Sequence, residues 1–148
     1  MNKFFFPKSV AIFGVSPSPG NVGIGILENL ERFSFKGHIY LIGEKGGSVR
    51  GRNIVKSIGE IAGTPDLAGF IIPARGIPGR LEECGKKGVH HVVIESGGFS
   101  EFGEEKESLE KEILDIANKW GMKILGPNCL GTINLENVLV LPFVRFHE

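Results

Sequence analysis

Short apolar runs and amphipathic stretches alternate along the chain. The apolar runs are about four or five residues long with little polar alternation, and they span 9–13, 39–42, 69–72, 92–94 and 122–125. Runs without polar alternation are typical of strands that are covered on both faces, as in a parallel sheet. The pattern therefore predicts five buried, mainly parallel strands.

Apolar positions between these strands recur at helical spacing. They do so over 23–33, 77–84 and 109–120, and Gly88 stands where the second of these helices would end. The segment 54–61 is weaker and predicts only a turn or two. Alternating strands and helices predict right-handed crossovers and an α/β fold. We expect a Rossmann-like, doubly wound parallel sheet in the strand order 3-2-1-4-5, with helices on both faces in a three-layer α/β/α arrangement.

Length and composition fit one globular domain over 1–148. Hydrophobic residues at 41% and charged residues at 23% exclude both a disordered chain and a membrane protein. The segment after Gly131 contains the apolar stretch 138–143, which predicts an additional edge strand. The chain ends soon afterwards, so we expect this domain to pack against something larger.

Charge and cysteine content narrow the setting of the protein. Seventeen basic and seventeen acidic residues give a formal net charge of zero, so the chain lacks the field that nucleic-acid binders use. Cys84 and Cys129 are too few for a disulfide scaffold, and the N-terminus lacks the apolar core of a signal peptide. No apolar run approaches the length that spans a bilayer. We therefore expect a cytoplasmic protein with no nucleic-acid or membrane partner.

Many of the 22 glycines stand at the ends of predicted strands. Open parallel sheets bind ligands beyond the carboxyl ends of their strands, where the strand order reverses. In the expected order this point lies between the first and fourth strands, which are followed by the loops 14–23 and 95–100. The first loop leads into a helix, so its free amides and the positive helix end can hold a phosphate. Its glycines, at 14, 20 and 23, do not match the dinucleotide fingerprint, and a Walker A loop is absent.

The loop after the second strand bears on the identity of the ligand. Glu44 stands where an NAD-binding domain places the acid that accepts a hydrogen bond from the ribose 2′-OH. Lys45, Arg50 and Arg52 follow it, and such a basic loop suits an adenosine with an extra phosphate, as in NADP or coenzyme A. The alternative is a solvated loop whose charges contact no ligand.

Few side chains are candidates for catalysis. Cys129 lies in the turn 126–131 with no histidine nearby in sequence, so we interpret it as a small buried residue. Glu95 ends the fourth strand, where it either contacts the ligand, orients a partner's loop or has a structural role. The four histidines show no metal-ligand spacing. We expect no metal site, and no catalytic residue, in this chain.

Five loop segments together resemble a known family. They include Ser96-Gly97-Gly98-Phe99-Ser100-Glu101 and Gly126-Pro127-Asn128-Cys129-Leu130-Gly131, a fairly specific pair. The others are 14–23, 40–45 and 72–74. Over about residues 7–142 the chain resembles the CoA-binding domain of NDP-forming acyl-CoA synthetases, a family similar to the alpha subunit of succinyl-CoA synthetase.

The resemblance implies a ligand and a set of contacts. It implies that the domain binds coenzyme A or acyl-CoA. The residues that it places at the CoA phosphates are Gly14, Ser16, Gly20, Asn21 and Val22, with Lys45 facing a phosphate at the ADP end. Those that it places beside the adenine or upper pantetheine are Ile72, Pro73 and Ala74. Those along the path of the pantetheine arm are Ser96, Gly97 and Gly98, with Asn128 and Cys129 nearby.

The resemblance also implies partners. Enzymes of the family convert acyl-CoA, a nucleoside diphosphate and phosphate into the acid, CoA and the triphosphate, through an acyl phosphate and a phosphorylated histidine. The domain with that histidine and the ATP-grasp module do not fit within 148 residues, so we expect further domains or subunits. One departure is that many relatives have Asn-Pro-Lys where this chain has Gly43-Glu44-Lys45. The alternatives are an NAD(P)-binding oxidoreductase domain and a free-standing CoA-binding regulator.

Overall fold

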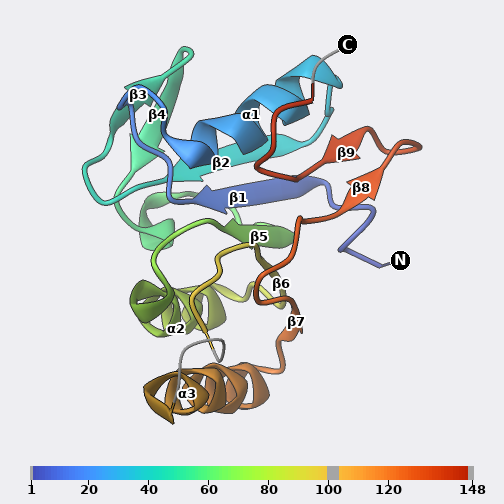
Figure 1. The fold of residues 1–148 in the computed structure, drawn as a ribbon. Helices are drawn as coiled ribbons and strands as arrows, with labels where there is room; N and C mark the ends of the chain where they lie inside the picture. The colour runs from blue at the N-terminus through green and yellow to red at the C-terminus, as the bar shows by residue number, and fades with distance from the viewer. Residues whose placement is uncertain (1, 100–103, 147–148) are drawn as a thin grey trace.

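A central, mostly parallel sheet organises the chain in a computed structural model that describes residues 2–99 and 104–146 (Figure 1). The described residues form seven strands in this sheet. In spatial order they are β3 (Gly47–Val49), β4 (Arg52–Val55), β2 (His38–Ile42), β1 (Ser9–Phe13), β5 (Leu67–Phe70), β6 (His91–Ile94) and β7 (Lys123–Leu125). Only the β3–β4 pair in this sheet is antiparallel.

Helices cover both faces of the sheet, which confirms the predicted fold class. They are α1 (Val22–Arg32), α2 (Ile77–Lys87) and α3 (Glu104–Trp120), with the short 3-10 helices η1 (Ile58–Glu60) and η2 (Ala74–Gly76). Figure 1 shows α1 on one side of the sheet and α2 and α3 on the other. The result is the three-layer, doubly wound arrangement that the alternating pattern predicts.

The predicted strand order is wrong in one place. The third predicted strand, observed as β5, pairs with β1 rather than with β2. The place beside β2 belongs to β4, which was not predicted as a strand and overlaps only the start of the weak helical turn expected over 54–61. β4 is short and lies near the sheet edge, and Arg52 and Asn53 remove the continuous apolar signature of a buried strand. The strand order therefore reverses between β1 and β5, not between β1 and the strand at 91–94.

Local sequence signals explain where the helices begin and end. The Asn21 side chain caps α1 by accepting a hydrogen bond from the Ile24 amide. Pro78 stands in the first turn of α2, where its missing amide costs no helical hydrogen bond. Gly88 ends α2 with a left-handed φ of 85°, which a glycine adopts without strain.

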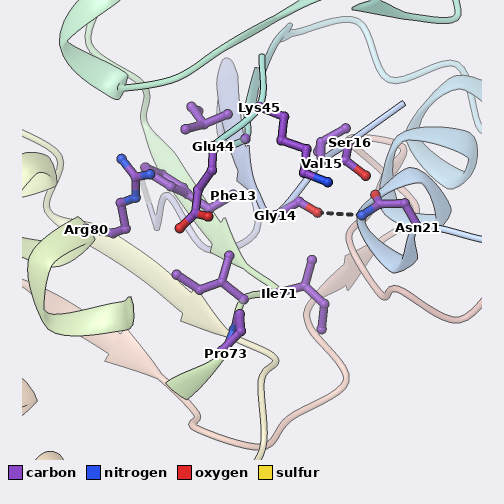
Figure 2. Close-up of a pocket in the computed structure, with 13 residues that line it drawn as sticks. Phe13, Gly14, Val15, Ser16, Asn21, Glu44, Lys45, Ile71, Pro73 and Arg80 are labelled. Carbon is purple, nitrogen blue, oxygen red and sulfur yellow. Dashed lines mark hydrogen bonds between the residues drawn. The ribbon is translucent and has the colours of Figure 1, made fainter. Parts of the chain in front are cut away.

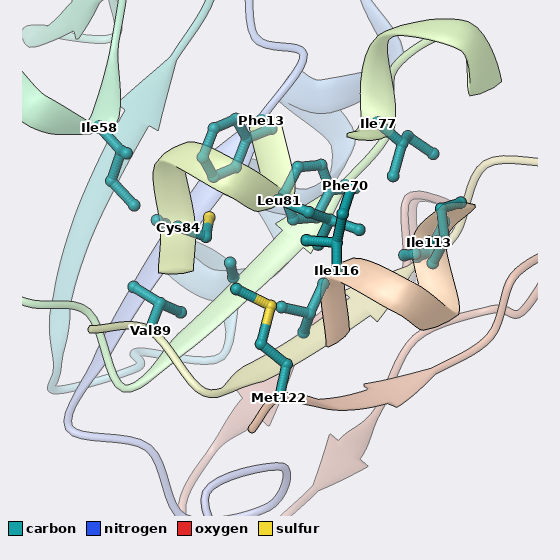
Figure 3. Packing of buried hydrophobic residues seen from close by; sticks show 14 of the residues in the cluster. Phe13, Ile58, Phe70, Ile77, Leu81, Cys84, Val89, Ile113, Ile116 and Met122 are labelled. Carbon is teal, nitrogen blue, oxygen red and sulfur yellow. The ribbon is translucent and has the colours of Figure 1, made fainter. Parts of the chain in front are cut away.

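Each face of the sheet has its own apolar core. The core beneath α2 and α3 contains Phe13 and Phe70, whose rings stack with centroids 4.4 Å apart (Figure 3). The core beneath α1 includes Leu27 and Leu30 with Leu139 from the C-terminal part of the chain. Burial of these side chains on both faces fixes the sheet as the rigid frame on which the loops are mounted.

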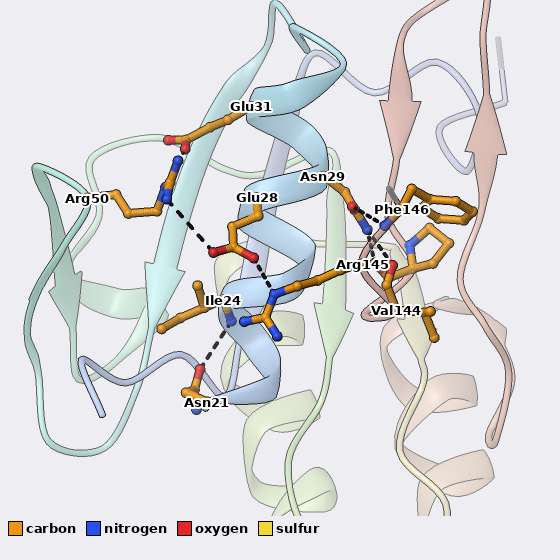
Figure 4. Close-up of polar contacts among 10 residues, drawn as sticks. Asn21, Ile24, Glu28, Asn29, Glu31, Arg50, Val144, Arg145 and Phe146 are labelled. Carbon is orange, nitrogen blue, oxygen red and sulfur yellow. Dashed lines mark hydrogen bonds and ion pairs between the residues drawn. The ribbon is translucent and has the colours of Figure 1, made fainter. Parts of the chain in front are cut away.

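The C-terminal segment packs against α1 and does not add an edge strand to the sheet, so that prediction is wrong. The segment first forms a separate antiparallel pair, β8 (Ile133–Asn134) with β9 (Leu139–Val140). Asn29 of α1, 1% exposed, then donates to the carbonyls of Pro142 and Val144, both at 2.8 Å (Figure 4). The apolar residues of the C-terminal segment therefore pack on the α1 face of the sheet rather than along a sheet edge.

Candidate functional site: a crevice over the strand ends

A crevice opens at the carboxyl ends of β1, β2 and β5. The chain leaves β1 toward α1 on one face and β5 toward α2 on the other, so the two following loops diverge and leave space between them. A cavity of about 320 Å³ lies here, and a second of about 300 Å³ adjoins it. The residues that line both are Gly14, Asn21, Ile71, Ile72 and Pro73. The two cavities therefore form one elongated crevice.

The turn after β1 forms the middle of this crevice. Gly14 has a φ of 102°, and a Cβ there would lie 2.2 Å from the Ile71 carbonyl oxygen, so only glycine fits. The Asn21 side chain donates to the Gly14 carbonyl at 3.0 Å and fixes the turn against α1. Within the described chain, no hydrogen bond uses the amides of Ser16 or Val22. Free amides at the positive end of an 11-residue helix are suited to bind a phosphate.

Charged side chains line one end of the crevice. Glu44 and Lys45 follow β2 and are exposed, and Arg80 reaches the same cavity from α2 (Figure 2). No ion pair among the described residues joins Glu44 to either cation. Sequence reasoning missed Arg80, which lies 35 positions after Lys45 on the polar side of a helix. The available signal was its place in the first turn of a helix that follows a central strand.

The two arginines after Lys45 are turned away from the crevice. Arg50 and Arg52 donate to the Glu31 carboxylate of α1, at 2.7 Å and 3.0 Å, and neither lines the two cavities (Figure 4 shows Arg50). Burial raises the pKa of Glu31, but the hydrogen bonds and charges of the two arginines outweigh it, so its pKa lies below the usual value. Of the three basic residues singled out in this loop, only Lys45 faces the crevice.

The other end of the crevice is built from backbone and small side chains. The Ser96 hydroxyl, at a residue 6% exposed, accepts from the Ile72 amide at 2.9 Å and donates to the Phe70 carbonyl at 3.4 Å. It thereby ties the end of β6 to the end of β5. The Asn128 amide donates to the Ser96 carbonyl at 3.0 Å, which brings the loop 126–131 against the loop after β6. Ser96 and Gly97 line the second cavity.

Glu95 and Cys129 lie beneath this end and do not line the crevice. Glu95 is 3% exposed, and one carboxylate oxygen accepts from the Phe143 amide at 2.9 Å, whereas the other has no partner among the described residues. Burial raises the pKa of Glu95 to about 8, although the Phe143 hydrogen bond opposes the shift. Burial also raises the pKa of the Cys129 thiol, which donates to the Ile94 carbonyl at 3.4 Å. These contacts favour structural roles for both side chains.

The structure brings most of the predicted site residues together. Those that line the crevice are Gly14, Ser16, Asn21, Val22, Lys45, Ile72, Pro73, Ser96 and Gly97. Those that do not are Gly20, Ala74, Gly98, Asn128 and Cys129. Ser100 and Glu101 of the second loop motif lie outside the described residues. The described part of the chain contains no cluster of side chains that could hold a metal ion, and no helix long and apolar enough to cross a membrane.

Two curated relatives have sequences close to this one. The alpha subunit of acetate–CoA ligase (ADP-forming) I from Pyrococcus furiosus is 43% identical over 137 residues, which cover 90% of this chain and 30% of that protein. Acetate–CoA ligase (ADP-forming) from Methanocaldococcus jannaschii is 44% identical over 140 residues, which cover 95% of this chain and 19% of that protein. The chain thus spans a third or less of the length of these relatives.

Solved structures and a family model agree with these relatives. The crystal structure of PH0766 from Pyrococcus horikoshii OT3 matches 96% of this chain and 32% of that one, with a TM-score of 0.89 and 40% identity. A dinucleotide-forming acetyl-coenzyme A synthetase from Ca. Korarchaeum cryptofilum, in complex with phosphate and ADP, matches 95% of this chain and 30% of that one, with a TM-score of 0.89 and 32% identity. A family model described as a CoA binding domain matches residues 8–134. The chain therefore belongs to the CoA-binding domain family, and it matches part of the ADP-forming acetate–CoA ligases above.

Proposed function

We propose that this domain binds coenzyme A in the crevice over β1, β2 and β5, as the CoA-binding part of an NDP-forming acyl-CoA synthetase. The observation that carries the proposal is the turn at Gly14, whose free amides lie between a cavity with two cations and a second cavity that is lined by Gly97. A phosphorylated adenosine with a long thiol-bearing arm needs these three features in this order.

The lining residues suit the parts of this ligand. The amides near Ser16 and Val22 would hold the pyrophosphate, and Lys45 would face a phosphate at the ADP end. Ile72 and Pro73 offer apolar surface for the adenine or the upper pantetheine. The arm would pass Gly97, where the missing side chain lets it approach the backbone. Asn128 would stand nearby, because a Cβ on Gly97 would lie 3.2 Å from its Oδ1 atom.

The complete reaction would require further parts of the enzyme. The relatives are named for different acids, including acetate and 4-hydroxybutyrate, although they share this domain. We therefore assign the choice of acid, the phosphorylated histidine and the nucleotide-binding ATP-grasp module to other domains or subunits. On this proposal the chain alone forms no ATP from acyl-CoA, ADP and phosphate, and it works in the cytoplasm.

One observation favours an NAD-binding domain as a second candidate. Glu44 ends β2, where an acid can accept a hydrogen bond from a ribose 2′-OH. Against it stands Arg80 beside Glu44 in the same cavity (Figure 2), since NAD has no phosphate on its ribose hydroxyls to engage this cation.

Calorimetric titration of the chain with CoA, dephospho-CoA, NAD and NADP separates the candidates. We expect CoA to bind most tightly, and Lys45→Ala to weaken CoA binding about tenfold, or about 1.4 kcal/mol. Lys36→Ala removes an exposed lysine that lies outside the crevice and should leave the affinity unchanged. Tight binding of NAD with no heat from CoA would contradict the proposal.

A further inference from the structure

Arg80 is the cation at the charged end of the crevice that the sequence did not reveal. One edge of its guanidinium group is held by hydrogen bonds, and the other edge is open. Its Nη1 atom donates to the Lys56 carbonyl and to both oxygens of Glu83, each at 3.1 Å. Within the described chain, its Nε and Nη2 groups have no hydrogen-bond partner. A planar guanidinium fixed in this way presents a ready pair of donors, and such a pair matches the oxygens of a phosphate.

Contacts from α2 and from the segment just before η1 hold Arg80 in place. Glu83, on the next turn of α2, also accepts a hydrogen bond from the Ser57 hydroxyl at 3.2 Å. Glu60 in turn accepts from the amides of Lys56 and Ser57, at 3.0 Å and 2.9 Å, which fixes the backbone that carries the carbonyl partner. The side chain of Arg80 is only 20% exposed. Little side-chain freedom therefore remains to be lost when a ligand binds.

The cations lie at different places in the cavity. In Figure 2 the Lys45 side chain extends toward Val15 and Ser16, whereas Arg80 lies with Glu44 at the end away from Asn21. Lys45 is thus placed near the phosphate-binding turn, and Arg80 is placed where the far part of a nucleotide would lie. Glu44 suits a free ribose hydroxyl, but it would repel a phosphate on the neighbouring hydroxyl unless a cation stood beside it.

We infer that Arg80 binds the phosphate on the adenosine ribose of CoA and so makes the domain prefer CoA over dephospho-CoA, with Glu83 as the residue that positions it. This inference rests on the proposed function, because it assumes that the adenosine of CoA occupies this end of the crevice. On this inference Arg80 determines the specificity for CoA over dephospho-CoA, a role that the glycine turn and Lys45 do not have.

Titrations of CoA and dephospho-CoA into matched variants test this role. Arg80→Met should weaken CoA binding at least tenfold and change dephospho-CoA binding by less than about twofold, so that the preference is lost. Glu83→Gln should lower the preference for CoA over dephospho-CoA by a smaller factor, because Arg80 keeps its charge but loses its orientation. Arg75→Met removes an exposed arginine of η2 outside the crevice and should change neither affinity. Thermal unfolding of each variant shows that it is folded, and Arg80→Lys, which keeps the charge, should retain part of the preference.

Each other result has a distinct meaning. Equal weakening of both ligands by Arg80→Met would show a merely structural residue and overturn the inference. An unchanged preference for CoA in that variant would overturn it as well and leave the proposed function intact. Failure of the unmodified chain to bind CoA would overturn the proposed function together with this inference.

Discussion

The two ends of the crevice are built from different chemistry. At the charged end, where we propose that the adenosine lies (the adenosine end), Glu44 and Lys45 are exposed, and Arg80 extends from a helix into the cavity. At the other end, where we propose that the pantetheine arm passes (the arm end), Ser96 is 6% exposed and its hydroxyl makes two hydrogen bonds at the strand ends, and Glu95 beneath it is 3% exposed. Substitutions at the first end should change which ligand binds, whereas substitutions at the second should change whether the crevice exists.

This difference follows from the sheet. Residues at the arm end follow β6, a strand buried on both faces, so any polar group there must find its partners within the protein. Residues at the adenosine end follow β2 or lie on α2, and of these Glu44 and Lys45 are exposed to water in the free protein, whereas Arg80 is partly buried. Exposed charges can be exchanged during evolution at little cost in stability.

The largest expected effect is at the arm end, in Glu95→Gln. The buried carboxyl of Glu95, with its pKa raised to about 8, stays protonated in the folded chain, whereas the unfolded chain loses this proton near pH 4.5. Stability therefore falls as the pH rises between these values, by up to about 1.4 kcal/mol per pH unit. Glutamine keeps an acceptor for the Phe143 amide and does not titrate, so denaturant unfolding from pH 5 to 8 should lose this slope.

An exposed acid of the same C-terminal segment provides the control. Glu136→Gln should leave the pH slope of the unmodified protein in place, because Glu136 is exposed to solvent. Parallel stability curves for Glu95→Gln and the unmodified chain would mean that Glu95 is charged in the folded protein, and the contrast between the two ends would lose its main support.

The next largest effect is expected at the middle of the crevice, in Gly14→Ala. The added methyl group would lie 2.2 Å from the Ile71 carbonyl oxygen, and alanine disfavours a φ of 102°. Together these should lower the free energy of unfolding by about 2–4 kcal/mol and abolish CoA binding. The measurement is denaturant unfolding followed by titration with CoA.

Gly20→Ala separates the steric clash of an added Cβ from the cost of a positive φ. Gly20 also has a positive φ, 78°, but a Cβ there would meet no atom within 4 Å. Gly20→Ala should lower the free energy of unfolding by only about 1 kcal/mol. Equal losses in the two variants would show that the close approach of Gly14 to β5 is not what shapes the turn.

The smallest effect is expected for Arg50→Met. This arginine is bonded to Glu31 and is absent from the lining of the crevice, so the affinity for CoA should change by less than twofold. The loss of an exposed ion pair should cost less than about 1 kcal/mol of stability. A tenfold loss of CoA affinity, as large as that expected for Lys45→Ala, would place the adenosine end over the β3–β4 hairpin instead.

How far the sequence predicts this molecule depends on how local each signal is. The helical spacing over 23–33, the stop at Gly88 and the apolar run of β1 depend on neighbouring residues, and they predict α1, α2 and β1 correctly. The place of β5 beside β1 depends on a pairing between residues nearly 60 positions apart, and no local pattern encodes it. β4 was missed because an outer strand with Arg52 and Asn53 lacks the buried signature.

The site shows the same division. The glycine turn and Lys45 follow central strands, so their sequence positions predict that they face the crevice. In the sequence Arg80 looks like any solvated position of an amphipathic helix, and only the three-dimensional structure brings it into the same cavity as Lys45. Arg50 follows Lys45 closely in sequence, but its orientation depends on Glu31 of another element. Charge in a loop predicts a basic surface, whereas the packing of other elements decides which charges reach the ligand.

Amide NMR shifts during a CoA titration of the labelled 148-residue chain test the central claim most directly. If the crevice seats the ligand, the amides of Ser16, Val22 and Gly97 shift in a saturable manner, and those around Glu31 and Arg145 stay in place. Saturable shifts confined to the α1 and C-terminal side, or no shifts at millimolar CoA, would contradict it.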